Sequence, residues 1–333
     1  MVHLHMASPL GNGHIQTLFP VIFRPAPAVV YQRTRFELSD KDFVDLDWLR
    51  SGNKRLVLLL HGLEGHSRRK YVCGMAQAAQ AQGFDVLAMN LRGCGGEPNR
   101  KLTMYHSGWT QDLHEVLLRV AREQDYQSVD LIGFSLGGNI ILKYLGESCQ
   151  VVPDFVRRTV VFSVPCDLED AARALARPEC QLYTWYLVSQ LREKIRVKDQ
   201  LFPGTLDIQG LDQIHTFQEF DDRFTAPMHG FRDAVEYWQK SSSKQFLSQI
   251  TRPTCLVNAH NDPFLGPQCF PVQEAQNNPW LTLIVPPTGG HVGFLGSGGK
   301  YWSEWIAMRF LRPGQEKNVQ YFSGFWNAHN FYT

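Results

Sequence analysis

Short apolar runs alternate along this chain with longer segments in which apolar residues return at helical spacing. The runs that predict buried strands cover residues 56–60, 84–90, 129–132, 160–164, 254–258 and 281–285. The segments that predict helices include residues 71–82, 108–123 and 139–145. An earlier segment, 34–49, alternates apolar and polar residues in places and predicts one or two antiparallel edge strands. These patterns indicate an α/β fold, with a mostly parallel twisted sheet flanked by helices on both faces.

A sharp turn between a predicted strand and a predicted helix carries the most informative residues of the chain. Gly133-Phe134-Ser135-Leu136-Gly137 matches the G-x-S-x-G pattern of a nucleophile elbow, in the strand–turn–helix setting that such an elbow requires. The turn crowds the backbone, so only small flanking residues fit. We predict that Ser135 is a nucleophile whose hydroxyl is held at the sheet edge, above a helix N-terminus. An idle serine in a glycine-flanked turn is the alternative.

The serine hydroxyl needs a base to take its proton, and the base needs an acid to orient it. In the fold that uses this elbow, the chain order is serine, then Asp or Glu, then histidine. His291 meets this order, because it follows the predicted strand 281–285 in a loop whose glycines free the backbone. We therefore predict His291 as the base and expect His260 to be structural.

The acid is predicted to be Asp262, in the loop that follows the predicted strand 254–258. Pro263 biases Asp262 away from helical geometry, which suits a carboxylate that projects from a loop. The Asp-Pro pair also initiates ordinary turns, so this pattern is not specific by itself. Asp167, which follows the predicted strand 160–164, remains open as the alternative acid.

Attack by Ser135 would build negative charge on a carbonyl oxygen, which two backbone N–H groups normally receive. Leu136, the residue after the nucleophile, is predicted to supply one of these donors. Leu63 is predicted to supply the other, because it lies in His61-Gly62-Leu63-Glu64-Gly65, directly after the strand 56–60. This segment resembles the H-G-x-x-G loop that provides the second donor of an oxyanion hole.

The order of these parts is that of an α/β-hydrolase, with the oxyanion loop, the elbow serine, the acid loop and the histidine loop each after a strand. Spaced motifs over most of the chain resemble, more specifically, the YheT-type branch of α/β-hydrolases, a bacterial group akin to eukaryotic α/β-hydrolase-domain lipases and esterases. Besides the elbow and the loops at Asp262 and His291, these motifs are the segments 11–17, 61–65, 90–96 and 220–227. The resemblance implies hydrolysis of carboxylic esters, usually with short- to medium-chain acyl groups, and some relatives act on lipids or transfer acyl groups to alcohols.

The length of 333 residues suits a single α/β-hydrolase domain better than two independent domains. We expect its core at about residues 30–165 and 251–312. The residues between, about 166–250, are inserted between late core strands, look largely helical and are expected to form a cap. The C-terminal tail, 313–333, is strongly aromatic; packing on the body is the expectation, and a dimer contact or a shallow membrane contact are the alternatives.

Charge and cysteine content limit the partners and the compartment. Lys and Arg number 33 against 32 Asp and Glu, so a formal net charge of +1 gives no electrostatic reason to expect nucleic acid or an anionic membrane as partner. No apolar run approaches the roughly 18 residues that span a bilayer, and the first residues lack a signal-peptide pattern. The seven cysteines are scattered and odd in number, which predicts reduced thiols in a cytoplasmic protein.

No cofactor is predicted from the motifs. The glycine-rich segment 93–96 lacks the G-x-G-x-x-G spacing of a dinucleotide site. A metal site at His61, Glu64 and His66 is the competing interpretation of the oxyanion loop, but the spacing differs from H-E-x-x-H on a helix. We therefore predict no metal.

The expected function is that of a serine esterase, EC class 3.1.1, that acts in two steps on a small-molecule ester. His291, oriented by Asp262, takes the proton of Ser135 during attack, and water then releases the acid from the acyl-enzyme. Acyltransferase or lipase activity with the same triad is one alternative. A ligand-binding protein on a hydrolase scaffold is the alternative from another class. The sequence does not decide acyl length or oligomeric state.

Overall fold

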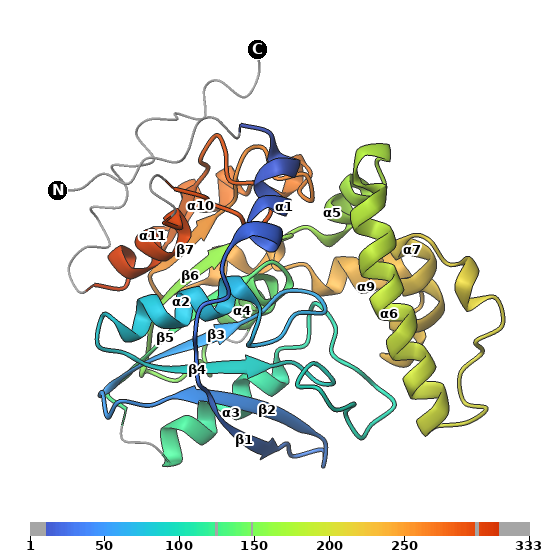
Figure 1. Ribbon diagram of the computed structural model, residues 1–333, viewed down its shortest axis with the longest axis horizontal. Coiled ribbons are helices and arrows are strands. Elements are labelled where there is room, and N and C mark those ends of the chain that lie inside the picture. Colours follow the sequence, from blue (N-terminus) through green and yellow to red (C-terminus); the bar gives the residue numbers. More distant parts are fainter. Residues whose placement is uncertain (1–10, 124–125, 148, 297–299, 313–333) are drawn as a thin grey trace.

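A single mixed sheet organises the part of the chain that the computed structural model describes, residues 11–123, 126–147, 149–296 and 300–312. Its eight strands run in the order β1-β2-β4-β3-β5-β6-β7-β8. The strands are β1 (Gln32–Glu37), β2 (Phe43–Leu49), β3 (Arg55–Leu60), β4 (Asp85–Asn90), β5 (Ser128–Phe134), β6 (Val156–Phe162), β7 (Thr254–Val257) and β8 (Leu281–Ile284). The predicted α/β fold with a mostly parallel sheet is confirmed, and Figure 1 shows the sheet twisting between helices.

Strand pairing separates an antiparallel edge from a parallel interior. β1 pairs antiparallel with β2, and β2 pairs antiparallel with β4, whereas every pairing from β4 through β8 is parallel. The prediction of antiparallel edge strands in the segment 34–49 is therefore confirmed. The predicted strand 160–164 is displaced: β6 begins at Val156 and ends at Phe162. Ser163 follows with a left-handed backbone at φ 52°, which ends the extended run.

Helices cover both faces of the sheet, as the hydrophobic pattern predicts. One core joins α2 and α11 to one face, and a larger core joins α3 and α4 to the other. The helices that accompany the sheet are α1 (Gly13–Phe23), α2 (Lys70–Gln80), α3 (Gln111–Glu123), α4 (Leu136–Glu147), α10 (Val272–Asn277) and α11 (Trp302–Phe310). Strands such as β3, whose Leu56 to Leu60 are almost fully buried, have apolar neighbours above and below, which explains their unbroken apolar runs.

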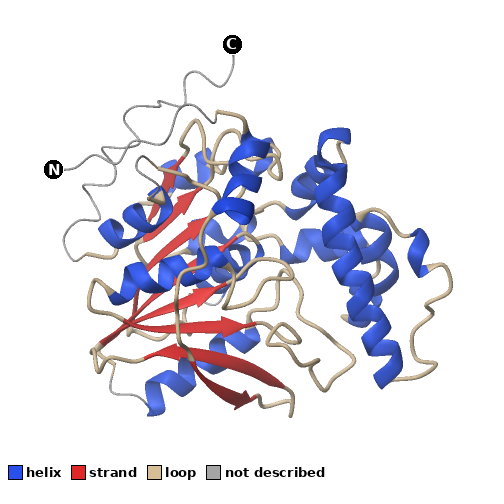
Figure 2. Cartoon of the chain, viewed as in Figure 1, coloured by secondary structure: helices blue, strands red, loops and turns tan. Residues whose placement is uncertain are grey.

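A helical layer is inserted between β6 and β7. It contains α5 (Leu168–Leu175), α6 (Gln181–Leu201), α7 (Phe217–Phe220), α8 (Ala226–Met228) and α9 (Ala234–Ser241), and a single π-helical turn, η4 (Asp221–Thr225). Figure 2 shows these helices gathered at one side of the sheet, with the long α6 running across them. Short turns complete the chain, namely η2 (Pro178–Cys180), η3 (Leu211–Gln213), η5 (Lys244–Gln249) and η6 (Pro267–Cys269).

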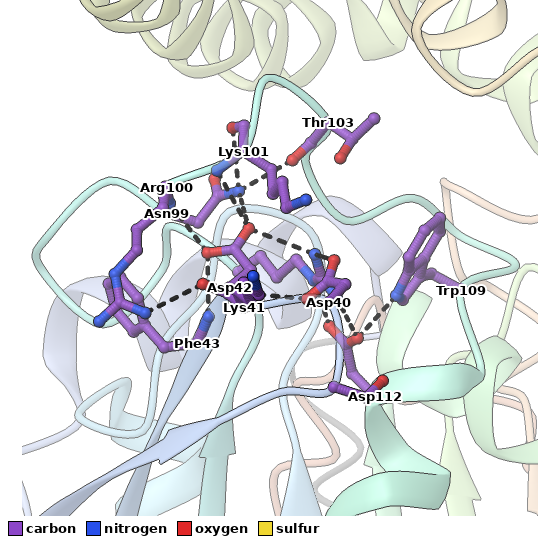
Figure 3. A network of polar contacts seen from close by, with 12 residues as sticks. Asp40, Lys41, Asp42, Phe43, Asn99, Arg100, Lys101, Thr103, Trp109 and Asp112 are labelled. Carbon is purple, nitrogen blue, oxygen red and sulfur yellow. Dashed lines mark hydrogen bonds and ion pairs between the residues drawn. The ribbon is translucent and has the colours of Figure 1, made fainter.

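A buried ionic network anchors the loop that leaves β4 (Figure 3). The Arg92 guanidinium donates two parallel hydrogen bonds of 2.7 Å to the Asp112 carboxylate, a bidentate pair in which both side chains are 2% exposed. Arg92 also donates to Asp40 at 2.7 Å and to Asp42 at 3.2 Å. Asn99 donates to the same Asp42 oxygen as Arg92, at 2.6 Å. The charges of Arg92, Asp42 and Asp112 are almost fully buried, so the loop is held by charge-assisted hydrogen bonds with little access to water.

Arg92→Ala is expected to lower the free energy of unfolding by about 3–5 kcal/mol, because it strands the buried carboxylates of Asp112 and Asp42 without a cation. Urea unfolding of both proteins would measure the difference. Arg173→Ala is the matched control, because Arg173 forms an ion pair with Glu169 while 75% exposed, and loss of an exposed pair costs roughly 0–1 kcal/mol. Equal losses in the two variants would contradict the role given to the buried network.

Candidate active site

The elbow predicted around Ser135 is present between β5 and α4. Ser135 follows the last residue of β5, precedes the first residue of α4 and has a left-handed φ of 51°. Its N–H donates to the carbonyl of Phe162 on the neighbouring strand at 2.8 Å, which fixes the turn against the sheet. A side chain at Gly133 would bring its Cβ to 2.7 Å from the Cα of Gly138, so this close turn requires glycine.

The three residues predicted as nucleophile, base and acid lie together. The Ser135 Oγ and the His291 Nε2 are 3.0 Å apart, and the His291 Nδ1 lies 3.0 and 3.1 Å from the two Asp262 carboxylate oxygens. The Asp262 side chain is fully buried, and the His291 side chain is 11% exposed. With its Nδ1 proton directed to the carboxylate, His291 presents an unprotonated Nε2 to the serine hydroxyl. This arrangement allows proton transfer from serine to histidine.

Asp167, the alternative acid, is used elsewhere. It is the N-cap of α5, and its side chain accepts a hydrogen bond from the backbone N–H of Asp170 at 3.1 Å. Such a cap satisfies an orphan donor of the helix terminus. Asp262 instead accepts the N–H of Phe264 at 2.9 Å, which orients the carboxylate within its loop. The geometry therefore pairs His291 with Asp262.

The histidine loop is braced by residues that sequence reasoning did not assign. The Thr17 hydroxyl of α1 accepts the backbone N–H of His291 at 2.9 Å, and the Ser163 hydroxyl accepts that of Val292 at 2.8 Å. The Phe264 ring stacks on the His291 ring, with centroids 4.1 Å apart. The segment 11–17 is one of the family motifs in the sequence. Only the fold shows that its Thr17 supports the loop that carries His291.

Thr17→Val is expected to lower kcat about tenfold, because it leaves the partly buried His291 N–H without its acceptor and loosens the loop that carries the base. Steady-state kinetics together with thermal unfolding would separate this effect from a general loss of stability. Thr184→Val is the control, because the buried Thr184 hydroxyl donates to the carbonyl of Leu175, as the Thr17 hydroxyl donates to that of Gly13, but Thr184 accepts nothing from the histidine loop. We expect Thr184→Val to lose stability but to keep its kcat; an equal fall in kcat would argue against a specific role for Thr17.

The loop predicted as the oxyanion loop lies against Ser135. A Cβ at Gly62 would be 3.1 Å from the Ser135 Cβ, which shows how closely this backbone approaches. Within the described part of the chain, the N–H groups of Leu63 and Leu136 have no backbone or side-chain acceptor. Both therefore remain available for a ligand oxygen beside Ser135.

His61 supports this loop from inside. Its Nδ1 donates to the carbonyl of Gly62 at 2.8 Å, and its Nε2 accepts the N–H of Leu91 at 3.1 Å. Burial lowers the pKa of His61 to about 3, so the ring is neutral and can make both contacts. Both ring nitrogens of His61 thus bond to backbone groups. Neither nitrogen is free to bind the metal ion that the competing interpretation of this loop would require. In the described residues, no cluster of three or more potential ligands forms a metal site.

A cavity of about 830 Å³ opens in front of these residues. Its lining comes from α1, from the predicted oxyanion loop and from the inserted helical layer, above all α6, and it includes Ser135 and His291. Apolar side chains dominate where α1 and α6 face it, among them Leu18, Val21, Leu182, Tyr183 and Tyr186. A largely apolar cavity with few convergent polar groups is the usual form of a small-molecule site.

A partly buried ionic contact ties α6 to the predicted oxyanion loop. The Lys194 ammonium lies 3.0 Å from the Glu64 carboxylate and 3.1 Å from the Cys94 sulfur. The Tyr105 hydroxyl donates to the same carboxylate at 2.5 Å and accepts the Glu64 N–H at 2.9 Å. Glu64 directly follows Leu63 and has a left-handed φ of 50°. The inserted helix and the predicted oxyanion donor are therefore held in one network.

The fold and this site define an α/β-hydrolase. Residues 55–297 match the model of the family described as "alpha/beta hydrolase fold", and the chain belongs to that family. It is 34% identical over 304 residues to YheT of Escherichia coli (strain K12), which is named as a proposed esterase, covering 90% of this chain and 88% of the relative. It is 29% identical over 290 residues to "Phospholipase ABHD3" of Mus musculus, covering 84% of this chain and 70% of the relative. The resemblance to the YheT-type branch is thus confirmed.

Solved structures share the fold at low sequence identity. An esterase of Pyrococcus furiosus, Pf2001, superimposes with a TM-score of 0.55 at 16% identity, covering 90% of this chain and 91% of that one. Alpha/beta hydrolase domain-containing protein 10 from mouse gives a TM-score of 0.51 at 12% identity, covering 88% and 100%. The names of the two sequence relatives, an esterase and a phospholipase, agree with the expectation of a carboxylic ester hydrolase. In the described residues, no helix is long and apolar enough to cross a membrane.

Proposed function

We propose that this protein is a serine hydrolase of carboxylic esters that acts through Ser135, His291 and Asp262. The observation that carries the proposal is the continuous path from the Ser135 Oγ through both His291 nitrogens to the buried Asp262 carboxylate, with each step at 3.0–3.1 Å. The Ser135 end of this path lies at a cavity of about 830 Å³, which has room for an acyl chain. These are the geometric relations that nucleophilic acyl transfer requires.

In the acylation step, the Ser135 Oγ attacks the ester carbonyl while its proton moves to the His291 Nε2. The Asp262 carboxylate stabilises the imidazolium that results and holds its ring in place. Negative charge develops on the carbonyl oxygen, and the Leu63 and Leu136 N–H groups would donate to it, each contributing roughly 3 kcal/mol. The His291 proton then passes to the departing alcohol, and the acyl group stays on Ser135.

Deacylation repeats the same steps with water as the nucleophile. His291 takes a proton from the water molecule, and the hydroxide equivalent attacks the acyl carbonyl. The tetrahedral intermediate again places its charge at the two backbone donors. Its collapse breaks the bond to the Ser135 Oγ, which regains its proton from His291 and releases the carboxylic acid.

The cavity favours substrates with an apolar acyl group, and we propose short- to medium-chain acyl esters. The apolar lining from α1 and α6 can bury an acyl chain at roughly 0.8 kcal/mol per methylene group. Relatives named as an esterase, a phospholipase and a monoacylglycerol lipase support ester chemistry as the reaction class. An alcohol that replaced water in the second step would convert hydrolysis into acyl transfer.

We also propose that residues 166–250 act as the cap of this single-domain enzyme, over a core at about 30–165 and 251–312. The contribution of α6 to the cavity and the Lys194–Glu64 contact support this division. The aromatic tail 313–333 lies outside the described residues. All seven cysteines are free thiols, which supports a reducing compartment, and we propose the cytoplasm.

The test is hydrolysis of p-nitrophenyl esters from acetyl to dodecanoyl, combined with fluorophosphonate labelling of the folded protein. Turnover with labelling of one serine supports the proposal, and the chain-length optimum measures the acyl pocket. A folded protein that neither turns over these esters nor reacts with the label would refute it. That result would favour a ligand-binding protein on the hydrolase scaffold.

A further inference from the structure

Exposed apolar side chains gather where two helices flank the cavity. Of the twelve large hydrophobic residues that are exposed in the described part of the chain, six lie at the end of α1 or the start of α6. These six, which we call the mouth patch, are Val21, Ile22, Phe23, Leu182, Trp185 and Tyr186. The two helices are neighbours, because the His14 Nδ1 lies 3.2 Å from the Tyr183 hydroxyl oxygen (Figure 1). Exposed apolar residues that gather in this way mark an interaction surface, whereas single ones are ordinary.

Neither helix carries a charged residue where the mouth patch lies. Residues 13–23, which form α1, contain no Asp, Glu, Lys or Arg, and the same holds for residues 181–190 of α6. A surface helix of a globular protein normally turns a charged face to water. Ile22 and Phe23 are 61% and 65% exposed, so their side chains do not fill the core of this protein. Their removal from water by a partner would be favourable.

The cavity opens through the mouth patch. Val21, Leu182, Trp185 and Tyr186 are exposed and also line the cavity. A partner that covers the patch would therefore lie at the entrance to Ser135. Tryptophan and tyrosine rings combine an apolar body with a polar group, which suits the boundary between water and hydrocarbon.

Positive charge lies beside the mouth patch. The basic run Arg68-Arg69-Lys70 lines the cavity next to α1. The Lys70 ammonium donates to the backbone carbonyls of Val21 and Ile22 at 2.8 and 3.2 Å, which fixes the run against the exposed end of α1. The Arg68 side chain is exposed. The apolar end of the helix and the basic run therefore form one continuous surface.

Negative charge is scarce in the segments that form this surface. Residues 11–36, which include α1, and residues 65–84, which include the basic run, contain no Asp or Glu. Glu64 lies nearby, but its side chain is only 9% exposed and pairs with Lys194. The formal net charge of +1 thus conceals a local excess of positive charge beside the cavity. Such a surface is complementary to an anionic one.

We infer that the mouth patch docks on an anionic lipid surface. The exposed ends of α1 and α6 enter the boundary between headgroups and acyl chains, and the basic run faces the lipid phosphates. An apolar helix face beside cations is the arrangement with which peripheral proteins bind anionic bilayers. The docking adds a partner to the proposed ester hydrolysis and does not depend on it.

The experiment measures sedimentation of the whole protein with vesicles of phosphatidylcholine, either alone or mixed with phosphatidylglycerol. We expect wild type to bind the mixed vesicles more tightly and to lose this preference as salt is added. The double variant Ile22→Glu, Phe23→Glu is expected to bind mixed vesicles about tenfold more weakly, because two charges replace apolar groups at the bilayer.

The matched control is the double variant Val151→Glu, Trp280→Glu, which also places charges on exposed apolar residues. Val151 precedes β6 and Trp280 precedes β8. Because β5, β6 and β8 run parallel, these residues lie at the opposite edge of the sheet from Ser135, which follows β5. We expect this control to bind vesicles as wild type does.

A charge variant tests the basic run separately. Arg68→Gln is expected to weaken binding to mixed vesicles about fivefold and to leave binding to pure phosphatidylcholine unchanged, because one cation near an anionic surface is lost. Arg157→Gln is its control, since Arg157 is exposed at the start of β6, away from the cavity. This pair also decides the matter if the Ile22 and Phe23 double variant does not fold.

The inference is overturned if wild type binds neither kind of vesicle, or if the control variants lose as much binding as their partners. A wild-type dimer in size-exclusion chromatography that the Ile22 and Phe23 double variant converts to a monomer would also overturn it, because the patch would then be a protein contact. That variant should hydrolyse the soluble ester p-nitrophenyl acetate normally, since both residues lie outside the cavity lining. Vesicle binding by a wild type that hydrolyses no ester would refute the proposed function alone.

Discussion

Replacing Ser135 with alanine is expected to abolish ester hydrolysis and covalent labelling together. The expected fall in kcat is roughly 10⁴- to 10⁶-fold, the range seen when the nucleophile of a serine triad is removed. The reason is chemical: without the Oγ no acyl-enzyme forms, and His291 loses the hydroxyl whose oxygen lies 3.0 Å from its Nε2. The residual rate would come from water held near the oxyanion donors.

The measurement is kcat on the preferred p-nitrophenyl ester, together with fluorophosphonate labelling followed by mass spectrometry. Ser107→Ala is the matched control, because Ser107 lines the same cavity but its hydroxyl has no place in the triad. We expect Ser107→Ala to keep the label, and Ser135→Ala to lose it. Labelling of Ser135→Ala at the wild-type rate would identify another nucleophile.

Asp262→Asn is expected to lower kcat by about 10⁴-fold while leaving the fold intact. The buried Asp262 carboxylate faces the His291 Nδ1 with both oxygens, at 3.0 and 3.1 Å. An asparagine amide directed at the same nitrogen would donate to it and favour the tautomer that carries its proton on Nε2. In that tautomer, His291 cannot take the Ser135 proton. The variant would also lose the charge that stabilises the imidazolium.

The control for this prediction is Asp167→Asn, which changes the alternative acid in the same way. Asparagine is as good an N-cap as aspartate, so α5 should keep its cap and the stability should change little. We expect Asp167→Asn to retain kcat within about twofold. Equal, large losses of kcat in both variants, with circular dichroism unchanged, would reopen the assignment of the acid.

The local features of the site could be predicted because neighbouring residues encode them. The elbow needs small residues around Ser135, and those residues stand beside it in the chain. The strand predictions were good for β3, β4 and β7, where apolar runs are continuous. The prediction for β6 was displaced, because Arg157 and Arg158 interrupt its apolar pattern at the start, and the left-handed Ser163 ends it early.

Helix α1 and the burial of Asp221 could not be predicted in this way. The α1 helix contains Pro20, which argues against a helix locally, and its first residues pack against the loops of Asp262 and His291. Asp221 lies in the family motif 220–227, and no chemistry is predicted for it from the sequence. Its burial depends on Trp238 and on the helices around it, which the local sequence does not reveal.

The sequence by itself determined the fold class, the order of the strands along the chain, and which serine, aspartate and histidine were candidates. Only the tertiary structure decided between Asp262 and Asp167 as the partner of His291, and it brought Ser135 to His291 across 156 positions of the chain. It also showed that α1 braces the histidine loop and that Asp221 faces the cavity. The physical reason is that turns and strands follow from neighbouring residues, whereas these contacts depend on the packing of the whole sheet and its helices.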